Sequence, residues 1–135
     1  PLFGSCDVAI LSAAVADYRP RRVADQKMKK SSDDLTIGLE PTRDILKTLG
    51  EKKSNQILVG FALETNNALE NAKGKLQRKN CDLIVLNSLA DARAGFGYDT
   101  NKVTFVTGNK IQETELKTKR DIAIELLHFI KEQFL

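Results

Sequence analysis

The sequence predicts an α/β fold in which helices cover an open and mostly parallel sheet. Three short, continuous apolar runs indicate strands at residues 7–11, 56–62 and 82–87. Runs of this length without polar alternation are typical of parallel strands that are buried on both faces. Segments with helical periodicity lie between or after these runs, and this alternation favours parallel pairing through right-handed crossovers.

Three helices are predicted from the spacing of apolar residues and from capping signals. In segments 66–80 and 119–134, apolar residues recur every four positions on one helical face. They are Ala68, Ala72 and Leu76 in the first segment and Ile122, Leu126, Ile130 and Phe134 in the second. The third helix is expected over 43–53, with Thr42 as its N-cap and Gly50 near its end.

Two further segments have the alternating pattern of antiparallel strands. Apolar residues alternate over 34–40, and 102–116 has a hairpin pattern with its turn near 107–110. We therefore expect a Rossmann-like open parallel sheet with flanking helices and an antiparallel flap that serves in dimerisation. A charged residue at Phe105 is expected to dissociate such a dimer or to unfold the chain. Alternatively, these segments could simply extend the sheet and have no further function.

Length and composition indicate one compact domain. The chain has 135 residues, of which 41% are hydrophobic, and this is enough to bury a core. Residue 1 comes immediately before the first predicted strand, and three parallel strands are few for a fold of this kind. We therefore interpret residues 1–135 as a single domain that is a fragment and lacks upstream elements.

Charge and cysteine content restrict the partners and the compartment. The 21 basic and 18 acidic residues are mixed along most of the chain and give a net charge of +3, so no nucleic-acid partner is expected. Cys6 and Cys81 each precede an aspartate and a hydrophobic run, which is typical of reduced thiols in a cytoplasmic protein. No apolar stretch approaches the roughly 20 residues of a membrane span, so no membrane partner is expected.

Polar side chains follow each of the three predicted parallel strands. They are Asp17 after the first strand, Glu64 and Asn66 after the second, and Asn87 after the third. In open α/β sheets ligands bind beyond the carboxyl ends of the strands, and small residues there let a ligand approach the backbone. A binding crevice and ordinary strand-to-helix connections explain this pattern equally well.

Two sets of lysines favour a polyphosphate ligand at this edge. Lys27, Lys29 and Lys30 form a cluster, and Lys75 and Lys79 lie one turn apart on the helix after the second strand. A charge run is more often a solvent-exposed face, and that reading is favoured for the second pair taken alone. The sequence contains no Walker-type loop and no dinucleotide glycine fingerprint.

Catalysis by histidine or cysteine is not expected. His128, the single histidine, lies beside the apolar stripe of the C-terminal helix, where packing or surface exposure explains it better than a triad or a metal site. Cys6 and Cys81 have no neighbouring histidine in the sequence, and free cysteine packs as a small hydrophobe.

The order of several motifs resembles that of a known enzyme family. These motifs are AAVADYRP followed by KMKK, then DLTIGLEPTRDIL, VGFALETNN, AKGKLQRKNCDLIVLN and GFGYDTN, and together they cover nearly the whole chain. AAVADYRP with KMKK is the most specific part of the match. The sequence is similar to bacterial phosphopantothenate–cysteine ligase, also called phosphopantothenoylcysteine synthetase, the C-terminal module of a bifunctional coenzyme A biosynthesis protein.

The resemblance implies a two-step ligation. CTP would activate the carboxylate of 4'-phosphopantothenate as an acyl-cytidylate with loss of pyrophosphate, and the amine of cysteine would then attack this intermediate. Mg2+ is expected because the triphosphate carries its own metal. The family also implies a homodimer, and it leaves open a fusion to an upstream flavin-dependent decarboxylase.

By the same resemblance, individual residues have expected roles. Lys27 and Lys30 would act as catalytic residues that neutralise the phosphates, and Asp17 would orient the nucleotide or its metal. The other residues expected to bind the nucleotide are Ala13, Ala14, Ala16, Tyr18, Asp44, Phe61, Lys75 and Lys79, with Phe96 as a further aromatic wall. Core packing explains the two phenylalanines at least as well. In PTRDIL, two residues separate Pro41 from Asp44 where the family has a Pro-Asp-Ile segment.

The glycine-rich segment and the following Asn-containing segment with which the family's synthetase module begins are not found in this sequence. We therefore expect these 135 residues alone to have little ligase activity. Two alternatives stay open. The chain could be part of another nucleotide-dependent α/β enzyme, such as an NAD(P) oxidoreductase, although the missing fingerprint counts against this. It could also be a non-catalytic unit for folding and dimerisation.

Overall fold

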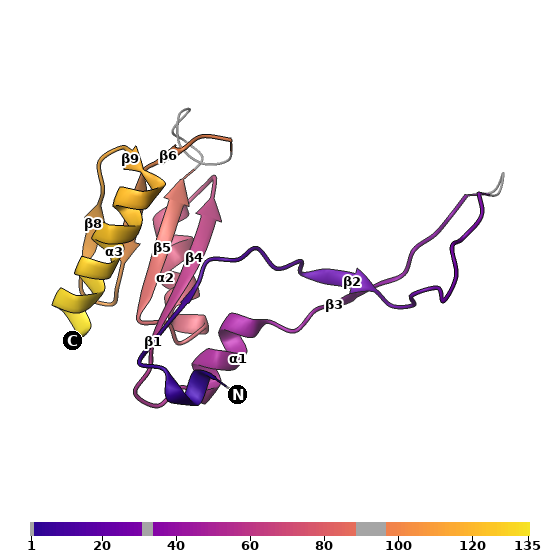
Figure 1. The fold of residues 1–135 in the computed structure, drawn as a ribbon, viewed down its shortest axis with the longest axis horizontal. Helices are drawn as coiled ribbons and strands as arrows, with labels where there is room; N and C mark the ends of the chain where they lie inside the picture. The colour runs from indigo at the N-terminus through magenta and orange to yellow at the C-terminus, as the bar shows by residue number, and fades with distance from the viewer. Residues whose placement is uncertain (1, 31–33, 89–96) are drawn as a thin grey trace.

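The computed structural model describes residues 2–30, 34–88 and 97–135, which form a body with one long arm (Figure 1). The body is built on a five-stranded sheet with the order β1-β4-β5-β7-β8. Its strands are β1 (Val8–Leu11), β4 (Ile57–Glu64), β5 (Leu83–Ser88), β7 (Val103–Val106) and β8 (Ile111–Glu113). β1, β4 and β5 are parallel, and β7 and β8 continue the sheet in antiparallel pairing. The predicted α/β fold and its three parallel strands are therefore confirmed.

Helices cover both faces of this sheet. Among the described residues, α1 (Ile45–Lys52) and α2 (Ala68–Arg78) pack on one face, and α3 (Lys119–Phe134) packs on the other (Figure 1). A short 3-10 helix (Phe3–Ser5) precedes β1. The short strands β6 (Thr100–Asn101) and β9 (Lys117–Thr118) pair beside the first turn of α3.

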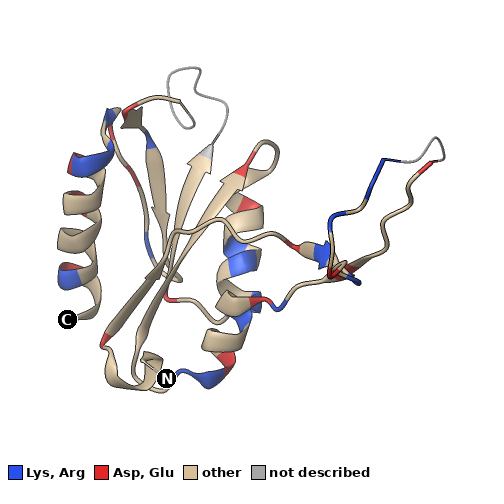
Figure 2. Ribbon diagram, turned by 45° about the vertical axis from the view of Figure 1, so that its right-hand side comes forward, with Lys and Arg blue, Asp and Glu red and all other residues tan. Residues whose placement is uncertain are grey.

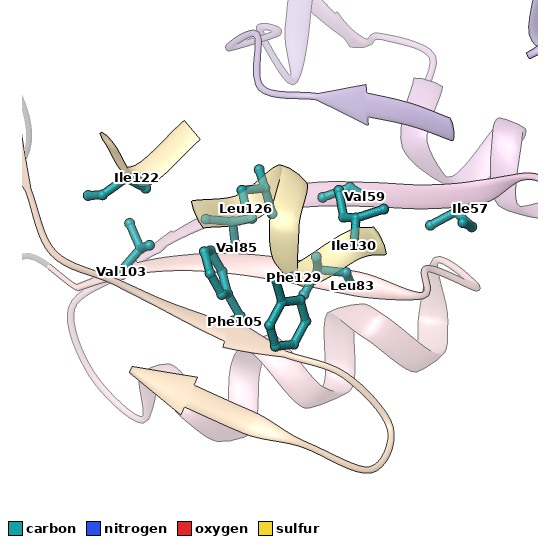
Figure 3. Close-up of a cluster of buried hydrophobic side chains, with 10 residues drawn as sticks. All are labelled: Ile57, Val59, Leu83, Val85, Val103, Phe105, Ile122, Leu126, Phe129 and Ile130. Atoms are coloured by element: carbon teal, nitrogen blue, oxygen red, sulfur yellow. The ribbon is translucent and has the colours of Figure 1, made fainter. Parts of the chain in front are cut away.

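The two faces of the sheet carry two hydrophobic cores, because successive residues of a strand point to opposite sides. Val59, Val85 and Phe105 pack against α3 (Figure 3), whereas Leu58 and Ile84 pack against α2. The residues that α3 contributes are Ile122, Leu126, Phe129 and Ile130, and those of α2 are Ala72 and Leu76. This packing confirms the apolar stripes predicted for both helices.

The hairpin predicted over 102–116 forms, but it does not stand apart from the sheet. Its turn lies where expected, since the Thr107 N–H donates to the Lys110 carbonyl at 2.9 Å. β7 lies inside the main sheet between β5 and β8. Phe105 is 0% exposed, and its ring centroid lies 5.0 Å from that of Phe129. Because Phe105 belongs to the core, a charge there is expected to unfold the chain and would not report on a dimer.

The antiparallel element that stands apart is an arm formed by residues 18–30 and 34–41 (Figure 1). In it, β2 (Tyr18–Pro20) pairs with β3 (Leu39–Pro41), and Arg19 forms an ion pair with Glu40 at 2.8 Å. The strand predicted over 34–40 is thus shorter than expected, because residues 34–38 are not in a strand. These residues are exposed, so no surface of the body covers their alternating apolar side chains.

The two cysteines are free thiols, as predicted. Cys81 is buried just before β5, and this burial raises the pKa of its thiol to about 11. The thiol therefore stays protonated at neutral pH, where it is a poor nucleophile. Within the described residues, no helix has both the length and the apolar character needed to cross a membrane.

Candidate functional site

A pocket of about 830 Å³ lies where the arm joins the body. Three groups of residues line it: 10–13 and 15–18, which end β1 and lead into the arm; 41–46, which lead from the arm into α1; and Phe61, Lys75 and Lys79. The loop after β1 is at the carboxyl end of a parallel strand, where ligands bind in open α/β sheets. Figure 2 shows basic and acidic residues on both α1 and α2, the two helices that flank the pocket.

The loop after β1 is held against the residue that follows the arm. The Thr42 N–H donates to the Asp17 carbonyl at 2.8 Å, and the Thr42 hydroxyl donates to the Ala16 carbonyl. Ala13 and Ala16 line the pocket with side chains small enough for a ligand to approach the backbone, whereas Ala14 is not among the lining residues. Thr42 therefore closes the base of the arm and does not cap α1 as predicted.

Asp44 is the N-cap of α1, because its carboxylate accepts the Lys47 N–H at 2.8 Å. The same carboxylate forms an ion pair with Lys79 at the end of α2. Partial burial raises the pKa of the Asp44 carboxyl. The hydrogen bonds from Lys79 and from the Lys47 backbone, together with both lysine charges, lower this pKa by more than burial raises it. The net result is a pKa below its ordinary value. Asp44 thus joins α1 to α2 at the pocket.

Two Asp44 variants are expected to separate the cap from the ion pair. Asparagine caps helices as well as aspartate does, so Asp44→Asn removes only the ion pair and should lower the free energy of unfolding by a few tenths of a kcal/mol. Asp44→Ala also removes the cap and should lower it by about 1 kcal/mol. Because the pKa of the folded state is lowered, the carboxylate stabilises the fold fully above pH 3.8 and loses this effect as the pH falls below that value. Urea unfolding at pH 7 and about pH 3 measures both effects. Equal losses in the two variants would show that the cap contributes nothing.

The structure brings the predicted pair Lys75 and Lys79 into the pocket. Lys75 Nζ donates to the Phe61 carbonyl at 2.7 Å, and both lysine side chains are half-buried. One ammonium group can donate three hydrogen bonds, so Lys75 keeps donors for a ligand. Asp17 and Tyr18 line the same pocket. The interpretation of these lysines as a plain solvent-exposed face is therefore not supported.

Other predicted residues lie elsewhere. Lys27, Lys29 and Lys30 are exposed on the arm and are not among the residues that line the pocket. Phe96 lies outside the described residues. Asn87 is on β5 and does not line the pocket; its side-chain oxygen is buried and has no hydrogen-bond partner among the described residues.

Glu64 and Asn66, the remaining candidates from the strand ends, accept hydrogen bonds at the loop that joins β4 to α2. The Glu64 carboxylate accepts a hydrogen bond from the Asn71 amide at 3.0 Å, and the same amide donates to the Asn66 carbonyl at 3.1 Å. These contacts hold the start of α2 against the end of β4. His128 is exposed on α3, as predicted.

The sequence analysis missed Arg43, a charged residue of the pocket. Arg43 lines the pocket just before Asp44. Its signal was present in PTRDIL, where it occupies one of the two positions between Pro41 and Asp44, but only Thr42 and Asp44 were expected to have roles in that stretch. Whether this side chain would face a pocket depends on the path of the chain between arm and helix, which periodicity does not reveal.

The described residues contain no group of three or more His, Cys, Asp or Glu side chains that could hold a metal ion. Asp17 and Asp44 are the acidic residues that line the pocket, and Asp44 is already paired with Lys79. The donor set fits a metal that brings phosphate oxygens of its own, which is how Mg2+ is commonly bound with nucleotides.

Residues 2–134 match the model of a family described as "DNA/pantothenate metabolism flavoprotein C-terminal domain". The chain belongs to this family. The match confirms the resemblance on which the sequence-based expectations rest. It also includes the residues that line the pocket, so the pocket is part of the domain that defines the DNA/pantothenate metabolism flavoprotein family.

Curated relatives in this family are longer than the chain. A protein from an unknown prokaryotic organism, named cysteine/cysteine sulfinic acid decarboxylase, is 52% identical over 130 residues, which are 95% of this chain and 36% of the relative. The coenzyme A biosynthesis bifunctional protein CoaBC of Bacillus subtilis (strain 168) is 48% identical over 131 residues, which are 96% of this chain and 32% of the relative. The chain thus spans about a third of the length of these relatives.

Among solved structures, the C-terminal domain of CoaBC has the same fold. Its TM-score to this chain is 0.76 with 42% sequence identity, and the similarity covers 97% of this chain and 56% of that one. The chain therefore corresponds to a little over half of the solved domain.

Proposed function

We propose that this chain is the nucleotide-binding part of a phosphopantothenate–cysteine ligase in coenzyme A biosynthesis. The observation that carries the proposal is the pocket after β1, which is lined both by small residues and by two lysines of the α2 region. The family and the name of the Bacillus subtilis relative support it. For the natural protein we also propose fusion to a flavin-dependent decarboxylase, because that relative is named as bifunctional. We propose a cytoplasmic location as well, because both cysteines are free thiols.

The proposed reaction has two displacement steps. A carboxylate oxygen of 4'-phosphopantothenate attacks the α-phosphorus of CTP, which forms the acyl-cytidylate and releases pyrophosphate. The amine of cysteine then attacks the acyl carbon and loses a proton, while CMP leaves with the electrons of the bond that breaks. Fixed cations beside the phosphates lower both barriers. Lys75 and Lys79 are fixed by the Phe61 carbonyl and by Asp44, so little reorganisation is needed.

Asp17 and the arm lysines complete the proposed set. Asp17 would hold Mg2+ that arrives with the triphosphate, and the metal would supply further neutralisation of phosphate charge. Lys27 and Lys30 would contact the phosphates as well. Because they are on the arm and do not line the pocket of their own chain, we propose that a second copy of the chain brings them there.

Lys75→Met is expected to weaken CTP binding by about 10-fold or more, since it removes a charge-assisted contact while keeping the apolar stem. Lys73→Met is the matched control, because Lys73 is on the same helix but is exposed and does not line the pocket. Titration calorimetry with CTP, ATP and NADPH, each with Mg2+, measures the affinities. CTP should bind most tightly. Tighter binding of NADPH would favour an oxidoreductase and refute the ligase, and unchanged CTP affinity in Lys75→Met would exclude the lysine from the phosphate site.

We also propose that two copies of the chain associate through their arms. Large apolar side chains are exposed along the arm at Tyr18, Val23, Met28, Leu35, Ile37 and Leu39, and Val23 is 84% exposed. An exposed apolar surface of this kind is typical of an interaction site.

Light scattering should therefore give the mass of a dimer, and Ile37→Asp should lower it to that of a monomer. Leu127→Asp is the control, because Leu127 is equally apolar and exposed but lies on α3. A monomer mass that does not change with protein concentration would contradict the proposal.

A further inference from the structure

We infer that Arg43 binds a phosphate group of a ligand in the pocket, an inference that rests on the proposed function. Neither the family resemblance nor the predicted lysine clusters assigned a role to this residue. Its place between the arm and α1 makes it the last side chain before the helix cap at Asp44. It lines the same pocket as Lys75, and so it is placed to contact a ligand there.

The guanidinium of Arg43 is oriented by a hydroxyl of the following helix. Arg43 Nε donates to Thr48 Oγ1 at 3.2 Å, and the same hydroxyl donates to the Asp44 carbonyl at 2.8 Å. The two terminal NH2 groups are left for other acceptors. A planar guanidinium with two free NH2 groups can bind two phosphate oxygens at once, which a lysine ammonium cannot match in geometry.

The charges of the pocket leave Arg43 without an acidic partner. Among the residues that the structure describes, five charged ones line the pocket: Asp17, Asp44, Arg43, Lys75 and Lys79. Lys79 is paired with Asp44, and Lys75 donates to a neutral carbonyl. Within the described ranges, no carboxylate lies within ion-pair distance of Arg43. A bound phosphate would supply the anion that both Arg43 and Lys75 lack.

Two ligands of the proposed reaction carry phosphate. CTP has a triphosphate, and 4'-phosphopantothenate has a phosphate monoester at the opposite end from its reacting carboxylate. A guanidinium at the pocket rim suits either group, and separate titrations with each ligand identify the one that Arg43 contacts.

The test compares Arg43→Gln with Arg43→Lys and with Arg120→Gln in the full 135-residue chain. Arg120 is an exposed arginine on α3, on the other face of the sheet, so it controls for loss of one positive charge. Titration calorimetry with CTP plus Mg2+ and with 4'-phosphopantothenate should show about 10-fold weaker binding of one ligand in Arg43→Gln. Arg43→Lys should keep part of the affinity, because lysine retains the positive charge but lacks the planar pair of NH2 groups. Arg120→Gln should bind as the wild type does.

The outcomes separate this inference from the proposed function. Wild-type affinity of Arg43→Gln for both ligands would overturn the role of Arg43, and the ligase proposal would stand if Lys75→Met still lost CTP affinity. A wild-type chain that binds neither ligand would overturn both. Thermal unfolding of each variant serves as the check on folding, since substitution of an exposed arginine should leave the melting temperature close to that of the wild type.

Discussion

Gly50→Ala is expected to destabilise the chain by about 3 kcal/mol or more. Gly50 is buried within α1, and a Cβ there would lie 1.8 Å from the carbonyl oxygen of Lys79 and 2.9 Å from its carbonyl carbon. Both are backbone atoms, so no side-chain rotation relieves the clash, and the cost is expected at or above the upper end of the roughly 1–3 kcal/mol that is typical of overpacking. Alanine is otherwise favoured over glycine in a helix by about 1 kcal/mol. Helix propensity thus predicts that Gly50→Ala stabilises the chain, whereas packing predicts that it destabilises the chain.

Gly108→Ala is the matched control for this prediction. Gly108 lies in the turn between β7 and β8, and a Cβ there would meet nothing within 4 Å. Its φ is not in the left-handed region, so alanine should change the free energy of unfolding by less than about 1 kcal/mol. Urea unfolding of both variants gives the comparison. If Gly50→Ala were as stable as Gly108→Ala, the close packing of α1 on the 79–80 turn would be disproved.

The contact at Gly50 also shapes the pocket. The Asn80 amide donates to the Gly50 carbonyl at 2.8 Å, and the preceding residue, Lys79, is paired with Asp44 at the other end of α1. These contacts hold α1 along the turn that ends α2. A variant that separates the two helices is therefore expected to lose nucleotide affinity together with stability.

The second large effect is expected in turnover. We predict that these 135 residues alone make phosphopantothenoylcysteine at least about 1,000-fold more slowly than a chimera that joins them to the part of the solved CoaBC C-terminal domain that they do not match. The chain covers 56% of that domain. Acyl-cytidylate formation needs the carboxylate and the α-phosphate held in line, and positioning of this kind accounts for several kcal/mol of a barrier.

Pyrophosphate release with CTP, 4'-phosphopantothenate and cysteine measures this difference. The same chimera with Lys75→Met is the control. Its turnover should fall by about 10- to 100-fold, which is less than the fall expected when the added segment is absent. Turnover by the 135 residues equal to that of the chimera would contradict the prediction and would mean that they contain the complete site.

The strands and helices of the body could be predicted because their signals are local. A continuous apolar run such as 56–62 needs burial on both faces, and the four-residue spacing of Ile122, Leu126 and Ile130 needs a partner surface on one face. Each requirement is met by the sheet and α3 as expected. The predicted hairpin at 102–116 also formed, but its pattern is the same whether it extends the sheet or leaves it.

Local sequence patterns were enough to predict the α/β class, the three parallel strands and the helical stripes, and the order of the motifs was enough to predict the family. Which cations share the pocket followed from the three-dimensional arrangement alone, because this depends on the direction of the arm and on the packing of α1 against the end of α2. Lys75, Lys79 and Arg43 line this pocket, whereas Lys27 and Lys30 lie on the arm and do not line it. A lysine cluster has the same sequence in a pocket and on an exposed arm, since its position is set by contacts between residues far apart in the chain.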